Sequence, residues 1–200
     1  MVKNIKKVAV LGSGIMGSGI ACHLANVGIE VLLLDIIPEN FKTSQNKNER
    51  NSIVNKALTT AVKSKPSPLY AKNKLSNITT GNFDDDFEKI EDCDWIIEVV
   101  VERLDIKNII FAKVDQFRKQ GAIVSSNTSG IPINSMLEKR SDDFKTHFLG
   151  THFFNPPRYL RLLEIIPTNY TDKNVVDFMH DFGSKILGKT TVLCKDTPAF

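Results

Sequence analysis

Three glycines and one aspartate carry the clearest chemical signal in this chain. Gly12, Gly14 and Gly17 follow an apolar run and open a segment with helical spacing, and the next apolar run ends at Asp35. This strand–turn–helix–strand pattern is typical of dinucleotide binding, because the glycines permit a tight turn and let a pyrophosphate approach the backbone and the N–H groups of the helix start. Asp35 would accept hydrogen bonds from the adenosine ribose and repel a 2′-phosphate, which favours NAD over NADP. The alternative is an ordinary glycine turn.

A second set of polar residues stands where later extended runs end. Asn127 and Ser129 offer neutral hydrogen-bond partners for a substrate oxygen. His152 is a candidate general base, because imidazole changes its charge near neutral pH. Glu164 lies in the next extended run, and a proline turn between the two runs could return it to His152 and stabilise an imidazolium. For a single histidine, the alternative is a hydrogen-bonded residue of the core.

The periodicity of the apolar residues predicts which elements position these side chains. Short apolar runs separated by helical segments are typical of an α/β protein with a Rossmann-type, doubly wound and mostly parallel sheet. A helical hairpin is expected after the second strand, formed by residues 53–62 and a short return helix at 69–75, and Asp84–Asp86 should open another short helix. We expect strands at 8–11, 29–34, 77–80, 95–100, 122–126, 148–153, 162–166 and 190–194, and further helices at 16–27, 107–118 and 174–187.

Composition narrows the class of protein further. The chain has 200 residues, of which 42% are hydrophobic, which is enough for one good core and one or two domains. No stretch approaches the ~18 consecutive apolar residues of a membrane span, and no signal-peptide pattern is present. Cys22, Cys93 and Cys194 lack the spacing of a disulfide framework or a zinc site. We therefore expect a cytoplasmic protein with no metal and no membrane contact.

One segment concentrates positive charge although the net charge is only +3. Residues 42–74 contain seven lysines and Arg50, against Glu49 as the one acid. The simplest interpretation is a solvated, lysine-rich surface helix. Nucleic acid is not an expected partner, because the segment has no aromatic platform or known binding motif.

Four ordered motifs resemble those of one enzyme family. They are Gly12–Ala21, Ser126–Ser129, His152–Pro156 and Lys195–Pro198, and together they are similar to the NAD-binding domain of L-3-hydroxyacyl-CoA dehydrogenases. The segment from His23 to Ile36 looks most like bacterial fatty-acid β-oxidation proteins that fuse this module to an enoyl-CoA hydratase. The resemblance runs essentially from end to end.

The resemblance implies a role for each matching residue. His152 would remove the 3-hydroxyl proton of an acyl-CoA substrate, Glu164 would be its carboxylate partner, and Ser129 would bind substrate and cofactor. The helical hairpin would help to hold coenzyme A, with Lys63 and Lys65 on its phosphates. The residues expected at the NAD site are Gly12, Gly14, Ile15, Met16, Gly17, Asp35, Glu102, Lys107, Asn127, Ser129 and Asn155.

The resemblance also implies a domain division and leaves two alternatives open. Residues 1–195 would form the NAD-binding domain, and 196–200 would begin a C-terminal helical domain that makes a homo-oligomer. Gly130 departs from the second serine or threonine of many members. One alternative is a module that binds NAD with little turnover alone. Another is a hydroxy-acid or opine dehydrogenase, which would not explain His152, Glu164 and the basic hairpin together.

Overall fold

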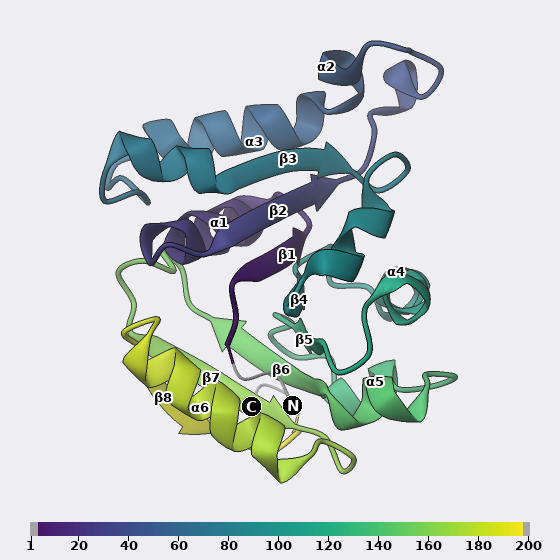
Figure 1. The fold of residues 1–200 in the computed structure, drawn as a ribbon, viewed down its shortest axis with the longest axis vertical. Coiled ribbons are helices and arrows are strands. Elements are labelled where there is room, and N and C mark those ends of the chain that lie inside the picture. The colour runs from purple at the N-terminus through teal and green to yellow at the C-terminus, as the bar shows by residue number, and fades with distance from the viewer. Residues whose placement is uncertain (1–3, 198–200) are drawn as a thin grey trace.

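A single eight-stranded sheet organises the computed structural model, which describes residues 4–197 (Figure 1). Its strands run in the order β3-β2-β1-β4-β5-β6-β7-β8. All neighbours are parallel except β6 and β7, which are antiparallel, so the expected Rossmann-type, mostly parallel sheet is confirmed. The strands are β1 (Lys7–Leu11), β2 (Glu30–Asp35), β3 (Ile78–Asn82), β4 (Trp95–Glu98), β5 (Ile123–Ser126), β6 (Phe148–Phe153), β7 (Leu162–Pro167) and β8 (Thr190–Leu193).

Helices cover both faces of this sheet (Figure 1). On one face, α1, α3 and α6 pack on a core that includes Ile20, Val54 and Met179. On the other, α4 and α5 contribute Phe111 and Phe144 to a second core. The helices are α1 (Ile15–Asn26), α2 (Lys47–Arg50), α3 (Ser52–Lys63), α4 (Leu104–Phe117), α5 (Asp142–Thr146) and α6 (Lys173–Lys185), with short 3-10 helices at Glu39–Phe41, Lys72–Asn77, Phe87–Asp92 and Ile133–Met136.

The central strands read as continuous apolar runs because both of their faces are buried. Val8 and Val10 of β1 lie in the first core, and Ala9 and Leu11 lie in the second. This pattern is expected of a parallel sheet that is covered on both sides. The carboxyl ends of β1, β4 and β5 therefore meet at one edge, where a doubly wound sheet binds its ligands.

The predicted return helix at residues 69–75 is wrong in part. Residues 69–71 are not helical, and a 3-10 helix begins only at Lys72. The Asn26 side chain explains the difference, because its amide donates to the Pro68 carbonyl and its oxygen accepts from the Tyr70 N–H, both at 2.8 Å. These two bonds hold the backbone of this segment against α1 in a conformation that is not helical. Helix α4 also begins earlier than expected, and α5 was not predicted.

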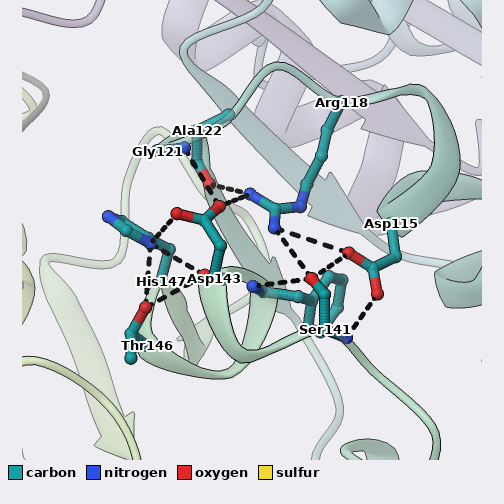
Figure 2. A network of polar contacts seen from close by, with 9 residues as sticks. Asp115, Arg118, Gly121, Ala122, Ser141, Asp143, Thr146 and His147 are labelled. Carbon is teal, nitrogen blue, oxygen red and sulfur yellow. Dashed lines mark hydrogen bonds and ion pairs between the residues drawn. The ribbon is translucent and has the colours of Figure 1, made fainter.

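A polar network closes the opposite edge of the sheet, at the amino ends of β5 and β6 (Figure 2). The Arg118 guanidinium lies between Asp143, at 2.7 Å, and Asp115, at 3.4 Å. Asp143 also accepts a hydrogen bond from the Gly121 N–H and lies 3.5 Å from His147. The Arg118 side chain is only 3% exposed, so these carboxylates compensate a charge that is largely removed from water.

Asp143→Asn should destabilise the protein by about 2 kcal/mol at pH 7, because a largely buried arginine loses a charged partner. Burial alone would raise the pKa of Asp143, but the Gly121 N–H and the Arg118 charge outweigh it and hold the pKa below its ordinary value. The carboxylate therefore stabilises the fold above about pH 4 and loses this effect as the pH falls through the lowered pKa. Urea unfolding of parent and variant at pH 7 and in acid tests this. An equal difference in the free energy of unfolding between parent and variant at both pH values would contradict this prediction.

Candidate active site

The glycine turn joins β1 to α1 at the carboxyl edge of the sheet. Gly12 has a φ of +108°, and a Cβ atom there would lie 2.6 Å from the Val99 carbonyl oxygen. A Cβ atom at Gly17 would lie 1.9 Å from the Gly12 carbonyl oxygen, so neither position accommodates a side chain. A Cβ atom at Gly14 would meet nothing within 4 Å. The turn thus has two closed positions that fix its shape and one open position that a ligand can approach.

The first turn of α1 presents backbone donors at this open position. The helix begins at Ile15, no side chain caps it, and no acid lies in its first turn. Its first N–H groups have no carbonyl acceptor within the helix, which suits a pyrophosphate. The Ile15 side chain is 79% exposed, whereas the Met16 side chain packs against the core. Met16 can therefore serve a phosphate through its backbone only.

Asp35 lies at the end of β2, directly beside the turn. One of its carboxylate oxygens accepts hydrogen bonds from the Ser13 N–H at 2.6 Å and from the Ser13 hydroxyl at 2.5 Å. The other accepts from the Ile36 N–H at 2.7 Å. These bonds fix a negative charge where the second strand of a dinucleotide-binding unit meets the adenosine ribose. The turn, the helix start and this carboxylate fit NAD.

His152 and Glu164 are in contact, because β6 and β7 are antiparallel with these two residues opposite each other in the register. The distance from His152 Nδ1 to Glu164 Oε2 is 2.7 Å, and each side chain is 16% exposed. An ionised carboxylate can only accept, so Nδ1 donates and Nε2 carries the ring lone pair. The Phe154 ring packs against the imidazole at 4.5 Å between centroids.

The loop after β5 approaches the same edge and is held by its own side chains. The Asn127 amide oxygen accepts from the Phe153 N–H at 2.9 Å, which ties the end of β5 to the strand that carries His152. Ser129 is exposed, and its N–H donates to Glu102 at 3.1 Å. Asn127 thus uses its oxygen structurally, and Ser129 is left at the surface of the site.

Lys107 and Glu102, both expected at the cofactor, occupy different environments. The Lys107 ammonium is buried, 2.7 Å from Glu98 and 3.2 Å from Glu102. Glu102 is 47% exposed. Lys107 thus lies beneath Glu102 and does not reach the surface of the site. The sequence prediction missed Glu98, because it ends an apolar strand and carries no separate motif.

A groove of about 660 Å³ links the glycine turn to α3 and to the loop after β6. Gly14, Ile15 and Asn155 line it. Its α3 side carries Ile53, Lys56, Ala57, Thr60 and Ala61, which share one helix face.

The groove separates the two lysines that were expected at coenzyme A. Lys65 borders it, but Lys63 faces a separate cavity with Thr59 and Val62. Lys56 was missed, although its helical spacing from Ile53 and Thr60 places it on the groove side. Two of the basic residues of this segment, Lys56 and Lys65, are therefore the ones that a groove ligand can meet.

Two findings bear on other classes of site. Within residues 4–197, no group of His, Cys, Asp and Glu side chains is arranged to hold a metal ion. None of the helices in this part of the chain combines the length and hydrophobicity of a membrane span.

The sheet order, the glycine turn and Asp35 together define a Rossmann-type dinucleotide-binding domain. A family model described as "3-hydroxyacyl-CoA dehydrogenase, NAD binding domain" matches residues 7–197. The chain belongs to this family, and NAD is its cofactor. The resemblance expected from the four motifs is thereby confirmed.

Individual relatives agree with the family match. A probable 3-hydroxyacyl-CoA dehydrogenase of Bacillus subtilis (strain 168) is 56% identical over 100% of this chain and 26% of the relative. A putative fatty acid oxidation complex trifunctional enzyme of Rickettsia felis is 45% identical over 100% of this chain and 27% of its own length. The crystal structure of FadB2 from M. tuberculosis superposes with a TM-score of 0.79 at 32% identity, covering 99% of this chain and 66% of that one. The chain thus spans about a quarter of the length of the two curated relatives.

Proposed function

We propose that this chain takes part in the NAD-dependent oxidation of (S)-3-hydroxyacyl-CoA to 3-oxoacyl-CoA in fatty-acid β-oxidation. The observation that carries the proposal is the 2.7 Å contact between His152 and Glu164 at the edge where the glycine turn opens. A glycine turn alone accounts for dinucleotide binding, but a histidine–carboxylate pair at that edge supplies a base for an alcohol substrate. The names of the two relatives support this substrate class.

Proton transfer is assigned to His152. Its Nε2 lone pair takes the proton of the 3-hydroxyl group, and the Nδ1 hydrogen bond to Glu164 stabilises the imidazolium that forms. Acceptance of a hydride from C3 is the chemistry that bound NAD supplies. Ser129 donates its hydroxyl to the substrate oxygen, and Asn155 lines the groove beside the glycine turn. Glu102 and Asn127 hold the loop that presents Ser129.

The groove beside α3 is proposed to receive the coenzyme A part of the substrate. Lys65 and Lys56 border it and supply positive charge for phosphate groups. Arg158 lies at its rim, where two carbonyl oxygens of the segment Ser67–Leu69 accept its hydrogen bonds. Lys63, expected at the phosphates, lies outside this groove and is assigned no such contact.

The wider setting of the chain is proposed from the same family. Residues 1–195 form the NAD-binding domain, and a helical domain that begins at 196–200 completes the acyl-CoA site and makes a homo-oligomer. Residues 1–3 and 198–200 lie outside the described part of the chain. A bacterial, cytoplasmic setting is supported by the Bacillus and Rickettsia relatives and by three cysteines that form no disulfide.

A second candidate function is NAD binding with little turnover. The observation that favours it is the length of the relatives, of which this chain spans 26% and 27%. Closure over a substrate normally excludes water and completes a site, so a domain that binds NAD before such closure turns over slowly.

One assay separates these functions. NADH is mixed with acetoacetyl-CoA, and the loss of nicotinamide absorbance is followed, with acetoacetate and pyruvate as matched substrates without coenzyme A. Oxidation of NADH by acetoacetyl-CoA alone supports the dehydrogenase. NADH binding with no oxidation by any substrate supports the binding module. Faster oxidation by pyruvate or acetoacetate would overturn the acyl-CoA proposal in favour of a hydroxy-acid dehydrogenase.

A further inference from the structure

Glu98 is a fully buried carboxylate that the proposed chemistry does not use. It is the last residue of β4, and its exposure is 0%. In the sheet register it lies opposite Leu11 of β1, directly before the glycine turn, and opposite Ser126 of β5, directly before the site loop. A carboxylate at this point stands between the two segments that form the NAD site.

Three donors satisfy the two oxygens of Glu98. Oε1 accepts from the Val100 N–H and from the Lys107 ammonium, each at 2.7 Å, and Oε2 accepts from the Ser126 hydroxyl at 2.6 Å. Burial raises the pKa of the Glu98 carboxyl, and Lys107 and the other donors oppose that rise. A buried ion pair is seldom more stabilising than apolar residues of similar volume. The stability of the fold therefore does not by itself explain a charge at this position.

The contacts of Lys107 lead from Glu98 to the surface of the site. Its ammonium lies 3.2 Å from Glu102, whose other oxygen accepts from the Ser129 N–H at 3.1 Å and from the Thr128 hydroxyl. The Ser126 hydroxyl, which donates to Glu98, also accepts from the Thr128 N–H at 3.2 Å. Glu98 is therefore joined to the Thr128–Ser129 segment by two separate routes.

We propose that Glu98 is a positioning residue, which holds Lys107 and through it Glu102 and Ser129 in the arrangement that receives the cofactor. The proposal rests on the proposed function, in which Glu102 holds the loop that presents Ser129 to the substrate. Glu98 touches neither ligand. If Glu98 loses its charge, Glu102 is the one carboxylate left beside the buried Lys107 ammonium. The ammonium then pulls Glu102 away from the Ser129 N–H.

A double-mutant cycle on NADH affinity, measured by calorimetry, tests the proposal. Glu98→Gln and Lys107→Met should each weaken NADH binding by about tenfold, and the double variant should also lose about tenfold rather than a hundredfold. This outcome corresponds to a coupling of about 1.4 kcal/mol. Amide hydrogen exchange at Ser129, measured without ligand, should be faster in Glu98→Gln than in the parent.

The control variant is Asp143→Asn, which removes a charged partner of Arg118 at the opposite edge of the sheet. It should lower stability and leave NADH affinity unchanged. Parent-like affinity in Glu98→Gln, or losses that multiply in the double variant, would overturn the proposal. If Glu98→Gln does not fold, Glu98→Asp keeps the charge but shortens its reach, and parent-like affinity and Ser129 exchange in that variant would overturn it equally. Absence of NADH binding by the parent would instead overturn the proposed function.

Discussion

Replacing His152 with alanine should lower the rate of NADH oxidation by acetoacetyl-CoA by about a thousandfold, because in this direction the protonated imidazole donates a proton to the C3 oxygen and a positioned general acid contributes 10²–10⁴-fold. NADH affinity should stay within about twofold of the parent value, since the expected NAD contacts lie on the glycine turn, Asp35 and the β5 loop rather than on the imidazole. The rate is measured in a single turnover with protein in excess, and affinity is measured by calorimetry.

Two further variants make the His152 result specific. Glu164→Gln keeps a hydrogen-bond acceptor 12 residues from His152 but removes the charge, so its rate should lie between those of the parent and His152→Ala. His147 lies at the amino end of β6, in the network of Figure 2, so His147→Ala should keep the parent rate. A parent-like rate in His152→Ala would show that another group exchanges the proton with the C3 oxygen.

Asp35→Ala should weaken NADH binding by about 10- to 100-fold, because a charged acceptor of ribose hydroxyls is worth about 1.5–3 kcal/mol. NADPH binding should improve, for two reasons. The repulsion of a 2′-phosphate disappears. The Ser13 N–H and hydroxyl, which donate to Asp35 in the parent, also become available to phosphate oxygens. Calorimetry with both cofactors measures the change.

Asp35→Asn is the matched control for charge. It keeps the size of the side chain and one oxygen acceptor, so it should lose less NADH affinity than alanine while still tolerating NADPH better than the parent does. Unchanged affinity of Asp35→Ala for both cofactors would mean that the adenosine ribose binds elsewhere.

The features that the sequence predicted well depend on local patterns. The glycine spacing before α1 and the apolar run that ends at Asp35 can each be recognised within a few residues. The sheet follows from the alternation of such apolar runs with helical segments. The contact of His152 with Glu164 was also predictable, because two extended runs joined by a proline turn pair in one register.

The features that the sequence did not reveal depend on distant partners. Glu98 ends an ordinary apolar strand, and its importance comes from Lys107 and Ser126, which lie on other elements. Residues 69–71 are not helical because Asn26 binds the backbone of Pro68 and Tyr70, and no local pattern indicates those bonds. Lys63 and Lys65 are close in sequence, but the end of α3 places them at different cavities.

The reversal of β7 has a consequence for how this site can diversify. The base and its carboxylate lie directly opposite each other in one antiparallel ladder, so a slip of a single residue would send Glu164 to the opposite face. Their alignment therefore depends on the register of β6 and β7, which the length of the hairpin tip between them, residues 154–161, helps to fix. Positions of that tip that line the groove, such as Tyr159, can change in composition, and hence in what the groove admits, while an unchanged length keeps the base and its carboxylate paired.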